Sequence, residues 1–355
     1  MRRIGFAVMA VGLSVSASIA AIVIVDLYLH HWAEEFWAVN AWGYRGAVVA
    51  RKRPGEHRLV VLGGSTVFGW GVTVDRAFPA QLETQLRPLS RNGAPVTVVN
   101  LGINSQGAYA FMGDLEDYRY LDYDSVVLYE GYNDLSDSRN LQFARRDSPV
   151  FSLTGYYAIF PKVFRDKAMA LRYGNSSAAD GNEKTVFKAG VADRVTAAAL
   201  EATVQMSSSL ERQLGRLNRA SGTTLDNRQL AVDSRGCPSR WDYCAAQYNA
   251  IQYALGQGKK VLVVTQPYLG SLHEEQQAAL RTMLAHEFRG VAGLRYVNLG
   301  PLFDPLTNPH GLFFDGMHAT AEGNRQIGSH LAGPVTELMS DAFDPAVRDG
   351  PASSR

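Results

Sequence analysis

Four side chains that are far apart in the sequence could together break or form an ester bond. Ser65 follows two glycines and could act as a nucleophile, while Asn133 could donate a hydrogen bond to an oxyanion. Asp315 precedes His318 by three residues, so one turn could bring its carboxylate onto the imidazole. Acyl transfer needs a nucleophile, a base, a group that orients the base and donors for the oxyanion. The four residues therefore predict ester chemistry by a serine mechanism.

Each of these residues also has a simpler explanation. Ser65 could cap a helix, Asn133 could lie in an ordinary turn, and an isolated Asp-x-x-His occurs by chance. A phosphate-binding Walker loop is excluded because no lysine precedes the hydroxyl residue, and Val67 replaces the second glycine of an α/β-hydrolase elbow. His310 is a rival base in the same loop as His318, but it has no carboxylate at a matching spacing.

The elements that would position these residues alternate along the chain. Strand-like apolar runs fall at 58–63, 96–101, 124–130, 260–266 and 294–299, and helical patterns at 78–89, 109–121, 241–256, 274–289 and 321–340. Strands that alternate with helices predict a parallel sheet covered on both faces. The candidate residues belong to four short blocks, 63–65, 99–107, 130–134 and 313–318. Since the first three blocks follow strands and the fourth precedes the last helix, we expect them to meet at the carboxyl edge of that sheet.

A long insertion separates the third and fourth strands. Residues 136–240 exceed what one crossover needs; the first half is aromatic and irregular, and a helical stretch follows at 191–219. Insertions of this length at the carboxyl edge of a sheet are typical of lids or substrate walls. The catalytic domain is predicted to cover 58–340, followed by a disordered tail at 341–355.

The amino-terminal segment predicts a membrane anchor. After Arg2 and Arg3, the run 4–25 is uncharged and long enough to cross a bilayer, which places the anchor at 1–29 and a juxtamembrane segment at 30–57. The arginine pair predicts that this end stays in the cytoplasm. The catalytic domain would then be periplasmic or extracellular, on a single-pass protein of the inner membrane. A cleaved signal peptide is the alternative, because small residues are frequent at 14–20.

Charge and cysteine content narrow the possible partners. A net charge of +1 gives no field that would select nucleic acid. Cys237 and Cys244 are the only cysteines, and so close a pair in an exported chain favours a small disulfide loop. Two buried free thiols are the alternative. A zinc site is not expected, because no matching Cys or His pair lies nearby.

The four blocks together resemble the SGNH, or GDSL-type, hydrolases over roughly residues 58–332. The resemblance matches Ser65 with the nucleophile and Asn133, in a Gly-Tyr-Asn-Asp block, with the oxyanion asparagine. It also matches Asp315 and His318 with the Asp-x-x-His pair. It implies a flavodoxin-like three-layer α/β/α sandwich with a parallel five-stranded sheet, without a metal or organic cofactor. The segment 41–46 is similar to the lead-in of membrane-tethered relatives, with no predicted role.

The sequence departs from this family pattern in two places. The usual Gly-Asp-Ser is Gly-Gly-Ser here, which should leave the nucleophile intact. In the second block the oxyanion glycine should fall near Ser105, whereas the glycines are Gly102 and Gly107. Any backbone N–H except that of proline can donate, so these three, with Ser65 and Asn133, form the predicted oxyanion set.

The resulting hypothesis is a serine esterase that acts on an acyl ester outside the cytoplasm, with a cell-envelope glycan or lipid as a plausible substrate. The first alternative is an O-acyltransferase of the same fold that modifies a polysaccharide, since only the acceptor differs. The second is a non-catalytic binding module, which is disfavoured because no member of the triad is missing. The sequence predicts neither the acyl chain nor the oligomeric state.

Overall fold

The computed structural model describes residues 2–35, 37–135, 145–146, 148–173, 190–220, 237, 242–303 and 311–343. The chain divides into two compact units. We call one the sheet unit; it comprises Glu35–Trp37, Tyr44–Ala144 and Asp226–Arg355. The other, the helical unit, comprises Met1–Glu34, Ala38–Gly43 and Arg145–Leu225.

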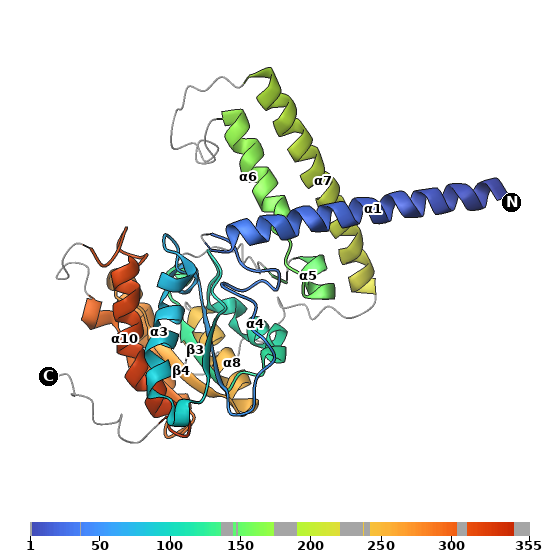
Figure 1. The fold of residues 1–355 in the computed structure, drawn as a ribbon. Helices are drawn as coiled ribbons and strands as arrows, with labels where there is room; N and C mark the ends of the chain where they lie inside the picture. The colour runs from blue at the N-terminus through green and yellow to red at the C-terminus, as the bar shows by residue number, and fades with distance from the viewer. Residues whose placement is uncertain are drawn as a thin grey trace. The chain divides into compact units, whose positions relative to one another are not determined.

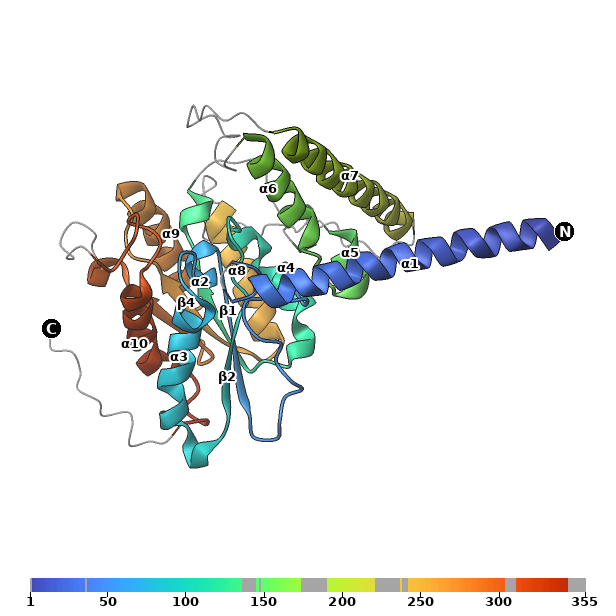
Figure 2. The same cartoon turned by 45° about the horizontal axis from the view of Figure 1, so that its top comes forward.

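A five-stranded parallel sheet forms the centre of the sheet unit (Figures 1 and 2). The strands pair in the order β2-β1-β3-β4-β5, which is the flavodoxin-like order. The predicted fold class is therefore confirmed, and each observed strand lies within one or two residues of its predicted bounds. These bounds are β1 His57–Gly63, β2 Val96–Asn100, β3 Ser125–Tyr129, β4 Lys260–Thr265 and β5 Leu294–Asn298.

Helices cover both faces of this sheet. α3 (Phe78–Leu86) and α10 (Ala321–Leu338) pack together on one face, while α4 (Phe111–Asp117), α8 (Asp242–Gly256) and α9 (Ser271–Glu287) lie on the other (Figure 2). α3 ends three residues earlier than the sequence pattern predicts. Its last predicted turn, Arg87–Leu89, is a 3₁₀ helix that contains Pro88, which has no N–H to continue the α-helical ladder.

The strands are continuous apolar runs because both faces of the sheet are buried. Leu59 and Val61 on β1 pack with the α3–α10 layer, and Phe78 and Leu82 of α3 belong to the same fully buried cluster. The alternate β1 residues, such as Val60, are fully buried as well. Burial on both faces is what requires apolar residues at every strand position, and it holds the carboxyl ends of the strands in a fixed register.

The lead-in segment, whose role the sequence did not predict, supports the loop that follows Ser65. The Arg45 backbone N–H donates to the Asn100 carbonyl at 2.9 Å. Its guanidinium carbon lies 4.2 Å from the centroid of the Phe68 ring, and Nη2 donates to the Val72 carbonyl at 3.2 Å. Burial lowers the pKa of Arg45 to about 10. Arg45 therefore joins the start of the sheet unit to both of the first two sequence blocks.

The helical unit contains α1 (Arg2–Ala33), α5 (Pro149–Thr154), α6 (Phe160–Tyr173) and α7 (Val191–Ala220). The expectation of irregular structure after residue 145 is wrong, because α5 and α6 form there. Ser148 caps α5 by accepting the Phe151 N–H at 3.4 Å, and Pro149 occupies the first turn. The described residues between 145 and 220 thus belong to the same unit as α1, whereas the sequence analysis assigned them to an insertion within the catalytic domain.

A buried carboxylate attaches α1 to α6. Asp26 is 1% exposed, and its Oδ1 accepts the N–H groups of Ile159 at 2.9 Å and Phe160 at 2.5 Å. The Tyr156 hydroxyl donates to the other carboxylate oxygen at 2.5 Å. Asp26 therefore satisfies amides at the start of α6 from a different helix. These contacts lie close to the end of α1, which continues to Ala33, beyond the predicted anchor boundary at residue 29.

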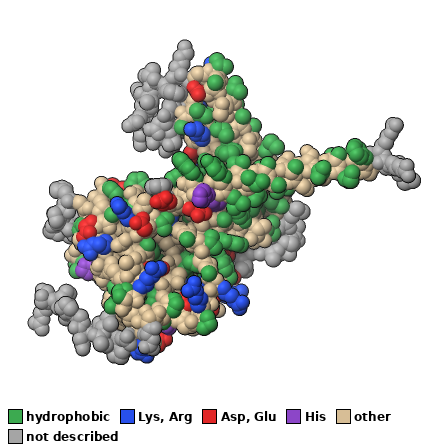
Figure 3. Space-filling model, viewed as in Figure 1, with side chains coloured by type: hydrophobic (Ala, Val, Ile, Leu, Met, Phe, Trp, Pro, Cys, Tyr) green, Lys and Arg blue, Asp and Glu red, His purple; other side chains and the backbone are tan. Residues whose placement is uncertain are grey.

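α1 is apolar and exposed along most of its length (Figure 3). Among the described residues it is the one helix whose length and composition would suffice to cross a membrane; the helical stretch is Gly5–Ala33, and an 18-residue window within it has a mean hydropathy of 2.5. The carboxyl-terminal tail was predicted to be disordered from residue 341, but Ala342 and Phe343 are buried in the core of the sheet unit, so the predicted start of the tail is wrong. Residues from 344 onward lie outside the described part of the chain.

The structure joins Cys237 and Cys244 by a disulfide bond. Cys244 is fully buried in the first turn of α8, which leads into β4. The bond closes a loop with a sequence separation of seven residues.

We expect loss of this disulfide to reduce stability modestly. Replacing both cysteines with alanine should lower the free energy of unfolding by about 2 kcal/mol, because a short loop restricts the unfolded chain only slightly. Denaturant unfolding of the two proteins measures the difference. Mass spectrometry of unreduced, alkylated protein is the direct control, and two alkylated thiols would contradict the assignment.

Candidate active site

The first sequence block forms a tight turn between β1 and α2 (Ser65–Phe68). A Cβ on Gly63 would lie 2.2 Å from the Tyr129 carbonyl oxygen, and one on Gly64 would lie 2.1 Å from the Asn133 side-chain nitrogen. Both positions therefore have no room for a side chain. The close approach of β1 to β3 places Ser65, in the first turn of α2, beside the block that contains Asn133.

Ser65, His318 and Asp315 form a continuous hydrogen-bonded chain. Ser65 Oγ lies 2.8 Å from His318 Nε2, and His318 Nδ1 lies 2.7 Å from Asp315 Oδ2. With Nδ1 carrying a proton that it donates to the carboxylate, Nε2 is free to accept the hydroxyl proton of the serine. The fold thus brings together all three predicted catalytic residues, although Ser65 and His318 are 253 residues apart in the sequence.

The loop before α10 holds Asp315 in place. Its Oδ1 accepts the backbone N–H groups of Met317 at 3.1 Å and His318 at 2.9 Å. Burial alone would raise the pKa of Asp315, but the hydrogen bonds from His318 and the two backbone N–H groups outweigh it and hold the pKa below its usual value. The ionised Asp315 therefore contributes its full stabilisation of the folded state when the pH is above the ordinary carboxyl pKa. This contribution is lost as the pH falls through the lowered pKa of Asp315.

Replacing Asp315 by asparagine should lower kcat strongly while leaving the fold intact. The side-chain oxygen of asparagine can still accept the two backbone N–H groups, which turns its NH₂ toward His318 Nδ1. That arrangement favours the tautomer with a proton on Nε2, which cannot accept the serine proton, and we expect a loss of about 10²-fold or more. Ester turnover and circular dichroism measure the two effects. Wild-type turnover in this variant would show that another group orients His318.

Asn133 lies in the 3₁₀ turn Tyr132–Asp134 directly after β3. Its side-chain NH₂ donates to the Gln106 carbonyl at 3.3 Å, and the same side chain hydrogen-bonds the carboxylate of Glu130. Asn133 is therefore held between the second block and the end of β3. A substrate oxyanion would share or replace one of these two partners.

Glu130 organises the site, and sequence reasoning assigned it no role. Its side chain is fully buried. The carboxylate accepts backbone N–H groups from Gly64 at 2.5 Å, Gly131 at 2.9 Å and Asn133 at 3.1 Å. Burial raises the pKa of Glu130, while these hydrogen bonds oppose the rise. The available signal was an acidic residue at the end of an otherwise apolar strand, where a carboxylate is costly unless it has several donors.

The second block supplies fewer oxyanion donors than predicted. Gly102 is excluded because its N–H donates to Asn100 Oδ1 at 2.9 Å, and its Cα packs against the backbone of Val67 and Phe68. Ser105 has a φ of 63°, the left-handed conformation that favours glycine, at the position where the family pattern has one. The set of candidate second-block donors is thus reduced to Ser105 and Gly107.

His310, the rival base, lies outside the described residues. Within the described ranges, no group of three His, Cys, Asp or Glu side chains is placed to hold a metal ion.

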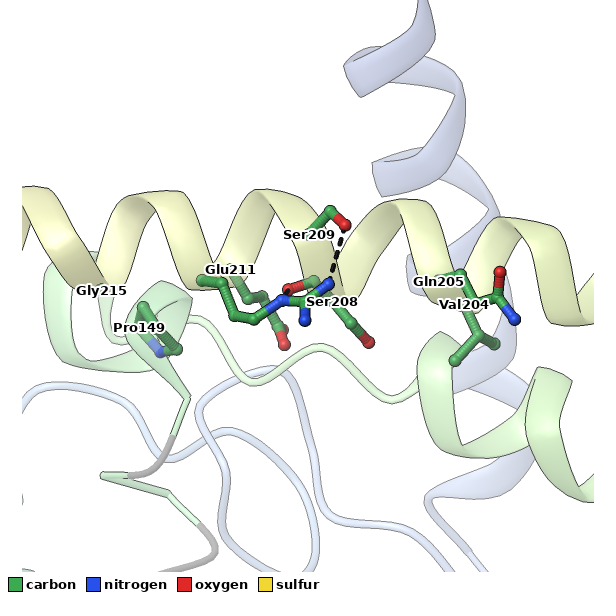
Figure 4. Close-up of a pocket in the computed structure, with 8 residues that line it drawn as sticks. Pro149, Val204, Gln205, Ser208, Ser209, Glu211 and Gly215 are labelled. Carbon is green, nitrogen blue, oxygen red and sulfur yellow. Dashed lines mark hydrogen bonds between the residues drawn. The ribbon is translucent and has the colours of Figure 1, made fainter.

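A separate cavity lies in the helical unit, between α5 and α7 (Figure 4). Its volume is about 610 Å³. Burial raises the pKa of Glu211, one of its lining residues, and Arg212 Nη2 donates to Ser209 Oγ at 3.0 Å across its wall. The residues that line it include serines but no histidine. Its lining residues are Pro149, Val204, Gln205, Ser208, Ser209, Glu211, Arg212 and Gly215.

No family model matches the chain, and no curated protein matches it significantly. Solved structures do match. A member of the lipolytic protein G-D-S-L family from Veillonella parvula DSM 2008 is 10% identical, with 77% of this chain and 94% of that chain covered and a TM-score of 0.40. A lipase/acylhydrolase from Enterococcus faecalis is 13% identical, with 79% and 95% covered and a TM-score of 0.38.

The acetylxylan esterase Axe2 from Geobacillus stearothermophilus is 12% identical, with 80% of this chain and 94% of that chain covered and a TM-score of 0.38. At such identities and TM-scores the neighbours do not indicate which reaction this chain performs.

Proposed function

We propose that the sheet unit is an SGNH-type serine esterase that cleaves an acyl ester. The observation that carries this proposal is the hydrogen-bonded chain from Ser65 Oγ through His318 to Asp315. A serine that only caps a helix has no need of an imidazole at 2.8 Å that is itself oriented by a carboxylate. A non-catalytic binding module would not need this arrangement either.

The reaction follows from the positions of the three side chains. His318 Nε2 takes the proton of Ser65 as Oγ forms a bond to the ester carbonyl carbon, and the carbonyl π electrons move to the oxygen. The bond to the alcohol oxygen then breaks, and that oxygen takes the proton from Nε2. Water, activated by the same imidazole, attacks the acyl-enzyme and releases the carboxylic acid. Asp315 stabilises the imidazolium during both halves.

The oxyanion would be bound by the Ser65 N–H, the Asn133 amide and one N–H of the second block. The Ser65 N–H belongs to the first turn of α2, whose amides have no partner within the helix. The Glu130 carboxylate accepts the backbone N–H groups of both Gly64 and Asn133. It therefore fixes the position of the Ser65 turn relative to that of Asn133. This arrangement prepares the donors before the charge develops.

Turnover of simple esters tests the assignment. The full chain, purified in detergent, should hydrolyse short-chain p-nitrophenyl esters, and Ser65→Ala should abolish the activity at unchanged stability. Adding an alcohol or sugar acceptor distinguishes the O-acyltransferase alternative, because a transferase forms the new ester in preference to free acid. Equal turnover by wild type and Ser65→Ala would contradict the serine mechanism.

We also propose that α1 anchors the protein in the inner membrane with the sheet unit outside the cytoplasm. Support comes from the exposed apolar surface of α1, from Arg2 and Arg3 at its start, and from the disulfide. Fusions of a periplasm-active and a cytoplasm-active reporter after Phe343 test the orientation. Activity of only the cytoplasmic reporter would contradict it.

A further inference from the structure

Two exposed aromatic rings border the Ser65–His318 pair. Trp70 follows α2, and the centroid of its ring lies 4.6 Å from that of His318 at an interplanar angle of 43°. Phe314 immediately precedes Asp315. Trp70 is 48% exposed and Phe314 is 54% exposed. The steps of the reaction use neither ring.

The loop that carries Trp70 packs against the Phe314 ring at Gly71. Gly71 directly follows Trp70 and has a φ of 85°, and a Cβ there would lie 2.8 Å from the edge of the Phe314 ring. The loop after the nucleophile therefore packs its backbone against one ring while it presents the other over the imidazole. Two exposed aromatic side chains beside a reaction centre are typical of a binding surface.

The chemistry of the reaction assigns this surface to the alcohol side of the ester. Nε2 of His318 must lie about 3 Å from the alcohol oxygen, which takes its proton when it leaves. The carbonyl oxygen instead faces the donor set that includes Asn133. The carbon atoms attached to the alcohol oxygen are therefore next to His318, where Trp70 and Phe314 lie. The same holds in the reverse direction, when a hydroxyl gives its proton to His318 and attacks the acyl-enzyme.

We propose that Trp70 and Phe314 bind a sugar ring, so that the alcohol of the ester, or the acceptor in a transfer, is a carbohydrate hydroxyl. This inference rests on the proposed serine mechanism. A pyranose presents a face of C–H groups that packs on an aromatic ring, while its hydroxyl groups stay in water. Half-exposed rings suit such a ligand, whereas a long alkyl chain gains most when it is enclosed on all sides. The exposed carboxylate of Asp315 adds a polar acceptor at the edge.

Esters that share an acetyl group and differ only in the alcohol test the proposal. The full-chain protein is assayed with mono-acetylated methyl glycosides of glucose, galactose and mannose, with ethyl acetate and with dodecyl acetate. The wild type should prefer at least one sugar ester to ethyl acetate in kcat/KM. Trp70→Ala and Phe314→Ala should each reduce that preference about tenfold, the usual worth of one ring contact. Trp70→Phe should retain most of it.

Tyr120→Ala is the matched control, because this exposed tyrosine lies in the turn before β3, at the opposite edge of the sheet. It should leave the preference unchanged. Three results would overturn the proposal. The wild type could show no preference for any sugar ester. The Trp70 variant could lose turnover of all esters equally, which would make Trp70 a positioning residue for His318. Or only dodecyl acetate could be affected, which would indicate an alkyl subsite.

A binding measurement separates this proposal from the mechanism on which it rests. Non-acetylated methyl glycosides should change the tryptophan fluorescence of the wild type, and the change should be lost in Trp70→Phe. If the wild type hydrolysed none of the esters but still showed the sugar-dependent fluorescence change, the esterase assignment would be contradicted and the sugar site would be supported. Ester turnover without any fluorescence change or sugar preference would contradict the sugar site alone.

Discussion

Replacing His318 by alanine should lower kcat by about 10⁴-fold or more without unfolding the protein. His318 is the group that takes the proton from Ser65 at 2.8 Å, and without it the serine hydroxyl is a weak nucleophile. Single-turnover and steady-state assays with a p-nitrophenyl ester measure the loss. Circular dichroism and the melting temperature show whether the variant is folded.

Two other histidines serve as controls for His318. His286→Ala changes an exposed side chain on α9 and should leave kcat unchanged. His310→Ala should retain most activity, because no carboxylate occurs at the spacing that Asp315 has to His318. If His310→Ala abolished turnover while His318→Ala kept it, the base would be wrongly assigned.

Replacing Asn133 by alanine should lower kcat by about 10²–10³-fold, the usual cost of one lost oxyanion donor. The effect should fall on kcat more than on KM, because the donor is used most strongly when negative charge has developed on the oxygen. A full kinetic comparison with Gln85→Ala, which removes a partly buried amide of α3 that donates to the Arg325 carbonyl at 3.3 Å, separates this loss from a general effect of losing an amide. A rise in KM at constant kcat would place Asn133 in substrate binding alone.

The parts of the site that the sequence predicted are those carried by local patterns. Strand runs, the glycine turn before Ser65 and the three-residue spacing from Asp315 to His318 are each contained in a short segment. The alternation of strands and helices predicts a parallel sheet covered on both faces and the meeting of the blocks at one edge, whereas the flavodoxin-like arrangement was expected only from the family resemblance. This is why residues 253 positions apart could be paired before the structure was known.

The features that the sequence missed depend on contacts between segments with no local signal. Glu130 binds the Gly64 N–H across 66 residues, and nothing in its own segment shows that partner. Gly102 was a candidate donor until the structure placed its N–H on the Asn100 side chain. Likewise, α6 begins where Asp26 of α1 satisfies its first amides, which a reading of 145–173 by itself cannot reveal.

Labelling with a serine-reactive fluorophosphonate tests the central claim most directly. The probe forms a covalent bond only with a serine whose hydroxyl is activated by a neighbouring base. The full chain should be labelled once, on the peptide that contains Ser65, as mapped by mass spectrometry. Ser65→Ala and His318→Ala should both lose the label. A wild-type protein that is folded but not labelled at Ser65, or a label that persists in Ser65→Ala, would contradict the assignment of Ser65 as the nucleophile.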